Sequence, residues 1–148
     1  MQYSEGTIGR VFTLRLEEDE RVPDCIEQFA KEHDIKTAYC AMLGGVDGGN
    51  IVVGPKDGEA PTIAPMLHAI TGAHEVAALG TIFSDEEGSP ILHMHAALGR
   101  DGKTRTGCIR PGLDVWLVGE VIIMEILGTD MIRKTEAKSG LKLLSKRD

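Results

Sequence analysis

The sequence has few aromatic side chains, few cysteines and no long apolar run. Aromatic residues make up 4% of the chain, so we expect a core of aliphatic side chains. The three cysteines are an odd number without the spacing of a disulfide framework, which favours a reducing cytoplasm over a secreted scaffold. No apolar stretch reaches the length of a membrane span, and the opening residues MQYSEGTIGR lack the apolar segment of a signal peptide. We therefore expect a cytoplasmic protein with no membrane partner.

An excess of basic charge is also absent, since the formal net charge is −7. Lys and Arg contacts to phosphates supply most of the non-specific affinity for duplex DNA, so this acidic chain is a poor candidate for that partner. The basic run at residues 134–146 is interrupted by Glu136. We expect residues 134–148 to form a solvated, partly flexible tail.

The length and composition are those of one globular domain. A chain of 148 residues buries roughly two-thirds of its unfolded surface, which is enough for a core without disulfides. Hydrophobic residues make up 42% of the chain and charged residues 26%, as in ordinary globular proteins. We expect a single domain over residues 1–148, without repeats or linkers.

Hydrophobic periodicity predicts a strand and then a helix at the start of the chain. Within residues 7–17, Phe12, Leu14 and Leu16 recur at every second position, which is typical of a strand with one face on the core. The following segment predicts a helix that begins at Pro23. Its apolar stripe consists of Cys25, Ile26, Phe29 and Ala30.

Five glycines fall within residues 37–55, among them Gly44, Gly45, Gly48 and Gly49. Neither a Lys-Ser/Thr pair nor a helix follows them, so the pattern disfavours a phosphate-binding loop and favours two strands joined by a hairpin or bulged turn. Residues 55–73 are expected to be mostly loop or short strand. Further strands are predicted at residues 74–83, 90–98 and 114–127, with a last short one near the C-terminus. The fold class predicted is α+β, with a largely antiparallel sheet of six to eight strands and one main helix near the N-terminus.

The segment PILHMHAALGRDGKTRTGCIRPG (residues 90–112) places two histidines one residue apart. Asp101-Gly102 is a strong signal for a two-residue type I′ turn. With that turn, His95 lies directly opposite Cys108, and both side chains project from one face. Directly opposed Cβ atoms lie about 4.5–5.5 Å apart, so both side chains can reach one cation.

His93 shares this face with His95, while Leu92 and Met94 point to the core. Two imidazoles and a thiolate suit zinc or another divalent transition metal and leave a fourth position open. We therefore predict a metal site at His93, His95 and Cys108. Two alternatives remain open: the histidines lie on a solvated face without a ligand, or a bulge shifts the register by one residue and turns Cys108 away.

Three further residues are candidates for lining this site. The same pairing places Arg110 opposite His93. Glu120 is an acid inside an apolar run, so it must meet a base such as Arg110 or line a polar cavity. His74 opens a predicted strand and is a candidate for the fourth ligand.

The chain resembles the plant-and-prokaryote-conserved (PPC) domain, the PD1-like DNA-binding family, in its single-domain prokaryotic type. Residues 9–52 are similar to the opening strand, helix and glycine-rich strands of that family. The segment HEVAALGTIFSDEEGSPILHMHAALGRDGKTRTGC (residues 74–108) resembles its core, with Leu-Gly and then His-x-His before a hairpin. The second hairpin strand of the family usually carries Gly-His, and here Gly107-Cys108 stands at that position.

The resemblance implies a PPC-like fold that assembles as a homotrimer and, in some prokaryotic members, carries a metal near the His-x-His strand. His93 and His95 match that pattern, and Cys108 replaces a histidine with another residue that binds zinc. The apolar residues 115–127 agree with a subunit interface. The basic AT-hook of plant members has no counterpart here, so duplex DNA is not expected as a partner.

Three functions from different classes follow, in this order. The first is a metal-binding homotrimer with a small-molecule or regulatory role. The second is an enzyme that uses the open coordination position at His93, His95 and Cys108, or Cys108 activated by His95. The third is a DNA-associated regulator, which the family label indicates and the net charge of −7 opposes.

Overall fold

The structure of the protein is a computed structural model that describes residues 1–60, 63–137 and 139–147. Its elements, in chain order, are β1 (Thr7–Glu17), β2 (Arg21–Val22), α1 (Asp24–Glu32), β3 (Thr37–Pro55), β4 (Pro65–Ala69), β5 (His74–Ser84), β6 (Pro90–Arg100), β7 (Lys103–Cys108), β8 (Leu113–Leu127), β9 (Met131–Thr135) and β10 (Lys142–Lys146). Among these residues, no helix has both the length and the apolar character needed to cross a membrane.

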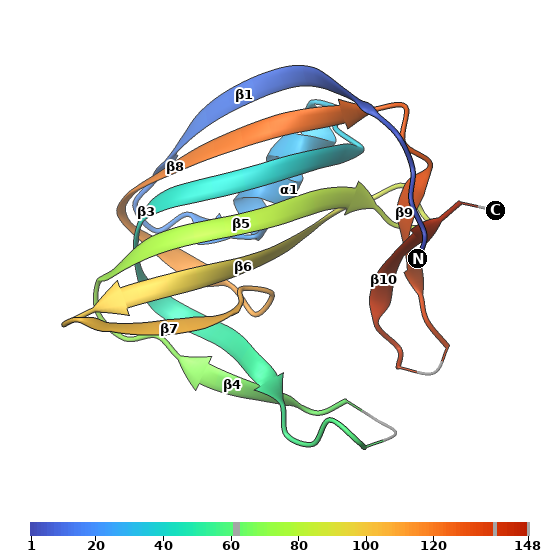
Figure 1. The fold of residues 1–148 in the computed structure, drawn as a ribbon. Coiled ribbons are helices and arrows are strands. Elements are labelled where there is room, and N and C mark those ends of the chain that lie inside the picture. The colour runs from blue at the N-terminus through green and yellow to red at the C-terminus, as the bar shows by residue number, and fades with distance from the viewer. Residues whose placement is uncertain (61–62, 138, 148) are drawn as a thin grey trace.

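The first eight strands form one antiparallel sheet with the order β1-β8-β3-β5-β6-β7, in which β2 adds to β8 and β4 to β3. Because Val52 of β3 also pairs with Cys108 of β7, the sheet curls back on itself, and α1 lies behind it (Figure 1). The predicted α+β architecture with one main helix is confirmed. The described residues hold ten strands, more than the six to eight expected, because β2 is very short and the C-terminal segment adds β9 and β10.

The amphipathic patterns of β1 and α1 place their apolar faces on one core. Leu16 is buried, and Phe12 packs against the core beside it, as the alternation predicts. Ile26 of α1 is fully buried, and the thiol of Cys25 lies half-buried on the same stripe. Burial raises the pKa of Cys25 to about 11 and that of Cys40 to about 12, so both act as small apolar core residues.

The glycine-rich segment is one bent strand, so the predicted hairpin is wrong. β3 runs for 19 residues and pairs with β5 on one side and β8 on the other. Its register against β8 shifts between Gly44 and Gly45, so the glycines accompany a bulge within one strand and not the predicted bulged turn between two strands. A Cβ at Gly49, whose φ is +102°, would lie 2.1 Å from the carbonyl oxygen of Gly112. Glycine at this position therefore allows the two backbones to cross closely. A close crossing and a turn both favour glycine, so the sequence alone does not distinguish them.

The C-terminal segment folds back as an antiparallel hairpin of β9 and β10 at one end of the main sheet (Figure 1). Arg133 of β9 is buried, and Lys142 of β10 forms an ion pair of 2.8 Å with Asp85. The segment expected to be a tail is thus largely strand over its described length, and residues 138 and 148 lie outside the described part. The charged composition alone predicted a tail. The contacts that order this segment involve residues far away in the sequence, and such contacts leave no local pattern.

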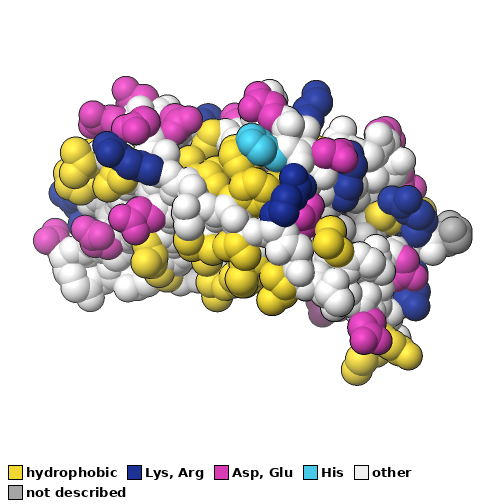
Figure 2. All heavy atoms as spheres, turned by 90° about the horizontal axis from the view of Figure 1, so that it is seen from above, with side chains coloured by type: hydrophobic (Ala, Val, Ile, Leu, Met, Phe, Trp, Pro, Cys, Tyr) yellow, Lys and Arg dark blue, Asp and Glu magenta, His cyan; other side chains and the backbone are white. Residues whose placement is uncertain are grey.

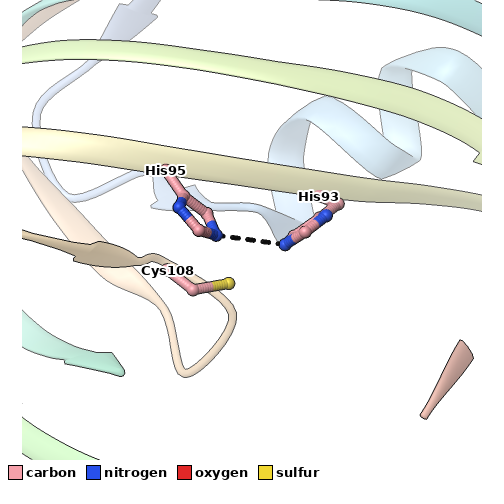
Figure 3. A group of neighbouring side chains, drawn as sticks. All are labelled: His93, His95 and Cys108. Atoms are coloured by element: carbon pink, nitrogen blue, oxygen red, sulfur yellow. Dashed lines mark hydrogen bonds between the residues drawn. The ribbon is translucent and has the colours of Figure 1, made fainter. Parts of the chain in front are cut away.

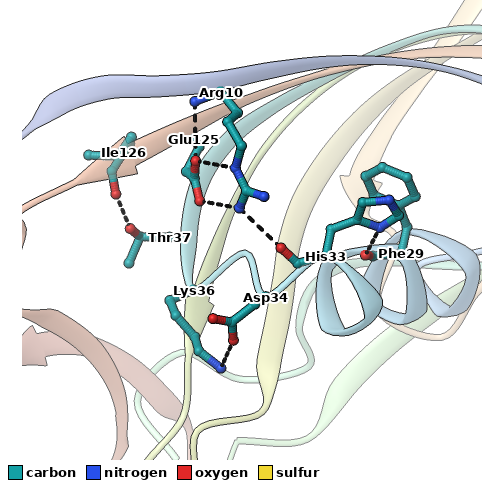
Figure 4. Close-up of polar contacts among 8 residues, drawn as sticks. All are labelled: Arg10, Phe29, His33, Asp34, Lys36, Thr37, Glu125 and Ile126. Atoms are coloured by element: carbon teal, nitrogen blue, oxygen red, sulfur yellow. Dashed lines mark hydrogen bonds and ion pairs between the residues drawn. The ribbon is translucent and has the colours of Figure 1, made fainter.

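A polar cluster fixes the end of α1 against the sheet (Figure 4). Arg10 donates from Nε and Nη2 to the carboxylate of Glu125 at 2.8 and 2.7 Å, and Nη2 also donates to the carbonyl of His33 at 3.0 Å. These hydrogen bonds hold the pKa of the buried Glu125 carboxyl below its usual value. The ring of His33 stacks on Phe29, so this histidine serves the helix end.

Candidate metal centre

The β6–β7 hairpin has the register that alternation and turn chemistry predict. Asp101 and Gly102 have φ angles of +50° and +68°, as a type I′ turn requires at both central positions. The ladder pairs His95 directly with Cys108. The alternative with a bulge and a shifted register does not occur.

Three side chains meet on the outer face of this hairpin (Figure 3). The Nε2 atoms of His93 and His95 lie 3.2 Å apart, and one ligand atom from each of His93, His95 and Cys108 lies within 4.8 Å of the others. Two nitrogen ligands of a tetrahedral zinc ion, each at about 2.0–2.1 Å, are separated by about 3.3 Å. Leu92 and Met94 are buried on the opposite face. The donor set and its spacing therefore fit one divalent transition metal.

The electrostatics of the site keep His93 in the form that binds metals. Burial, followed by the charges of Arg133, His95 and Arg110, lowers the pKa of His93 to about 4. The ring is therefore neutral near pH 7 and offers a lone pair. Because His95 is exposed and Cys108 is half-buried, the cluster is accessible from solvent.

Two guanidinium groups lie beside the cluster, and the sequence indicated only one of them. β7 ends at Cys108, so Arg110 reaches the site from the following turn and not from the predicted strand position opposite His93. Arg133 comes from β9, is 4% exposed, and donates from Nη2 to Oγ1 of Thr81 at 3.1 Å. Thr81 lies directly opposite His93 across β5 and β6, so the Arg133 guanidinium lies beside that imidazole.

Two predicted lining residues lie elsewhere. Glu120 is exposed on β8, opposite Arg15 of β1, and two strands separate β8 from β6. His74 begins β5, five residues before Leu79, the partner of His95, which places it roughly 17 Å along the strand from that pair. Neither residue therefore joins the cluster within one chain, although Glu120 lies opposite Arg15 and lines the groove described next. Their positions depend on the order of the strands in the sheet, which alternation within each strand does not supply.

An apolar groove of about 760 Å³ crosses the same face of the sheet. One row of directly paired residues runs across this face from β8 to β7: Ile122, Ala41, Leu79, His95 and Cys108. Leu43 and Leu79 are 60% and 62% exposed. Figure 2, seen from the β1 side, shows hydrophobic side chains at the surface in the middle of the molecule. The candidate metal centre therefore borders an exposed apolar surface.

A curled antiparallel sheet with one short helix and a His/His/Cys cluster on its outer face defines a β-rich domain with a candidate metal centre. The sequence profile of the Plants and Prokaryotes Conserved (PCC) domain matches residues 3–127. The chain belongs to this family, which is the PPC family that its motifs resemble.

Solved structures have the same fold. A metal-containing protein from Archaeoglobus fulgidus is 25% identical, with 99% of this chain and 100% of that chain covered and a TM-score of 0.86. A plant- and prokaryote-conserved protein from Pyrococcus horikoshii is 23% identical, with 100% and 99% covered and a TM-score of 0.85. A proposed DNA-binding protein from Bacteroides thetaiotaomicron is 18% identical, with 97% of each chain covered and a TM-score of 0.80. The last two likenesses show the fold alone. A comparison with curated proteins found no match.

Proposed function

We propose that the protein is a cytoplasmic, homotrimeric, metal-binding member of the PCC family with a small-molecule or regulatory role. Each chain holds one divalent transition metal, most suitably zinc, through His93, His95 and Cys108. The observation that carries the proposal is the 3.2 Å separation of the two imidazole Nε2 atoms, with the Cys108 sulfur in the same cluster. A metal bound there supplies a Lewis-acidic centre with one open position.

The chemistry of the donors supports zinc over magnesium or calcium. A thiolate and two neutral imidazoles are soft or borderline ligands, whereas magnesium and calcium prefer oxygen. The lowered pKa of His93 removes proton competition from one ligand at neutral pH. The related protein from Archaeoglobus fulgidus, which is 25% identical over nearly the whole chain, is a metal-containing protein.

The apolar groove beside the site supports self-association of the single 1–148 domain. Leu43 and Leu79 each leave about 60% of their surface exposed on one sheet face, and Ile122 lies in the same groove. Covering apolar surface contributes roughly 25 cal/mol per Å², so a neighbouring subunit on this face would stabilise the assembly. In the proposed homotrimer, this groove would lie between subunits, next to His95.

An enzyme that uses the open coordination position is the second candidate function. The two arginines beside the cluster favour it, because fixed positive charges next to a Lewis-acidic metal suit a polar, anionic substrate. His93, His95 and Cys108 would then be the metal ligands, with Arg110 and Arg133 as binding groups.

Metal analysis of protein purified without chelator tests the proposal. Wild-type protein and a His33→Ala control are expected to hold about one metal ion per chain, since His33 lies at the helix end. The metal content of His95→Ala is expected to be at least about tenfold lower than that of wild-type protein, because a zinc site rarely survives the loss of one of three ligands. Plasma emission spectroscopy measures all three proteins under one protocol.

Equal metal content in wild-type protein and His95→Ala would defeat the assignment. Cys108→Ser separates the two forms of the site. Loss of the metal supports the three-ligand set, whereas full retention would show a site of histidines alone and remove Cys108 from it.

A further inference from the structure

The guanidinium of Arg133 is buried without a carboxylate partner. Its residue is 4% exposed, and Nη2 donates to the neutral hydroxyl of Thr81. Nε has no hydrogen-bond partner among the described residues. Burying a charged group without an opposite charge is strongly unfavourable. A ligand that supplies the missing negative charge would offset this cost.

A second cation lies next to Arg133. Burial and the nearby Arg110 lower the pKa of Arg133, while the sulfur of Cys108 acts in the opposite direction. Arg110 is exposed and forms no ion pair with the described residues. Two guanidinium groups therefore converge on the side of the cluster where Thr81 and His93 lie.

The acidic side chains near this position have other partners. The buried carboxylate of Asp85 pairs with Lys142 and accepts hydrogen bonds from backbone N–H groups. Burial raises the pKa of Glu27 on α1, and a hydrogen bond of 2.8 Å from the backbone N–H of Leu92 and the charge of Arg110 act in the opposite direction. Asp85 is therefore paired with Lys142 and Glu27 acts on Arg110 alone, so neither carboxylate pairs with the guanidinium of Arg133.

We propose that Arg110 and Arg133 bind the oxyanion group, a carboxylate or a phosphate, of a small ligand whose other end reaches the open position of the metal. The inference rests on the proposed function for the metal end of the ligand only. The carrying observation is the unpaired Nε of Arg133 beside the His93–His95–Cys108 cluster.

The arrangement suits an oxyanion better than a neutral group. A guanidinium presents parallel N–H donors that match two oxygens of a carboxylate or phosphate. Thr81 fixes the orientation of the Arg133 guanidinium, so little freedom is lost when the anion binds. Arg110 stands at the exposed side and attracts the anion from solvent. Together they select ligands that carry a negative group at one end and a metal-binding group at the other.

Isothermal titration calorimetry with two probes tests the inference. Inorganic phosphate and malonate are titrated separately into zinc-loaded protein and into chelator-treated protein. Binding of either probe that depends on the two arginines supports the inference, and the more tightly bound probe identifies the preferred oxyanion. Arg110→Gln is expected to weaken the bound probe at least about tenfold, because it removes a charged partner of the anion. Arg133→Lys keeps the charge and removes the planar donors, so it is expected to weaken binding as well.

Arg105→Gln is the matched control, because this substitution removes the same charge as Arg110→Gln. Arg105 lies on β7 three residues before Cys108 and therefore on the opposite face of the strand. This variant is expected to bind the probes like wild-type protein. Failure of both probes to bind wild-type protein at millimolar concentration would overturn the inference. So would equal affinities in wild-type protein, Arg110→Gln and Arg133→Lys.

The metal-free arm separates this inference from the proposed function. If binding disappears with the metal and ignores both arginine substitutions, the metal alone holds the anion, so this inference fails and the metal proposal stands. If the protein contains no metal but binds the probes through Arg110 and Arg133, the proposed function fails and the inference stands.

Discussion

Arg133 donates a hydrogen bond of 3.1 Å from Nη2 to Oγ1 of Thr81, the residue directly opposite His93 in the sheet. This contact connects the C-terminal hairpin to the strand beside the candidate metal centre. Residues that lie 52 positions apart in the sequence thus build one side of the site. The β9–β10 hairpin belongs to the site as well as to the fold.

Thr81→Val is expected to destabilise the protein. The substitution preserves the side-chain shape but leaves another donor of a buried guanidinium unpaired, which costs about 1–3 kcal/mol of unfolding free energy. Urea denaturation of chelator-treated protein measures this loss. Thr104→Val, at an exposed position of β7, is the control and is expected to stay within about 0.5 kcal/mol of wild type. Equal stabilities for both variants would show that the contact with Arg133 contributes nothing.

His93 is expected to titrate near pH 4 in metal-free protein, because burial and the neighbouring cations disfavour its protonated form. The unfolded chain takes up the proton near pH 6.5, so the contribution of His93 to stability is complete above that pH and is lost as the pH falls towards 4. NMR titration of the histidine resonances measures the midpoint. A midpoint near the ordinary histidine value would contradict the burial and charge effects.

Leu43→Asp is expected to break the assembly. A carboxylate in the apolar groove must lose its hydration when another subunit covers it, which opposes association. Light scattering is expected to give three times the chain mass of 16.0 kDa for wild-type protein and 16.0 kDa for the variant. Leu67→Asp replaces a similarly exposed leucine on β4, outside the groove, and should remain a trimer. A monomeric wild-type protein would rule out the homotrimer.

Weak affinity for duplex DNA is expected at physiological salt. The chain carries a net charge of −7, and repulsion from the phosphates outweighs local basic patches. Fluorescence anisotropy with a labelled duplex, measured over a series of salt concentrations, tests this. Tight binding with a steep salt dependence would establish the DNA-associated alternative, despite the acidic composition.

The sequence predicted the metal candidates because the interactions that place them are local. Alternation puts His93 and His95 on one face, and a two-residue turn brings Cys108 level with His95, so that all three lie within one hairpin. The same reasoning predicted β1 and the apolar stripe of α1. In each case, the signal and the structure that it specifies occupy one short segment.

Features that depend on distant pairing escaped prediction. Arg133 reaches the site only because β9 lies beside the end of β5, where Asp85 and Arg133 form an isolated bridge. Glu120 lies far from the site because β8 inserts between β1 and β3. Gly49 of β3 is required because two backbones cross closely there. The other backbone is that of Gly112, more than a third of the sequence away. Sequence periodicity contains no information on which strands become neighbours.

The insertion of β8 between β1 and β3 has a consequence for how the chain folds. Thr7 pairs with Leu127, so β1 acquires its partner only after the chain has been made as far as β8. Such high contact order slows folding, because the entropic cost of closing the long loop comes before the favourable free energy of strand pairing. The meander of β5, β6 and β7 has only short connections and can form without waiting for β8. His93, His95 and Cys108 therefore come together early, while β1 remains an unpaired edge until β8 has been made.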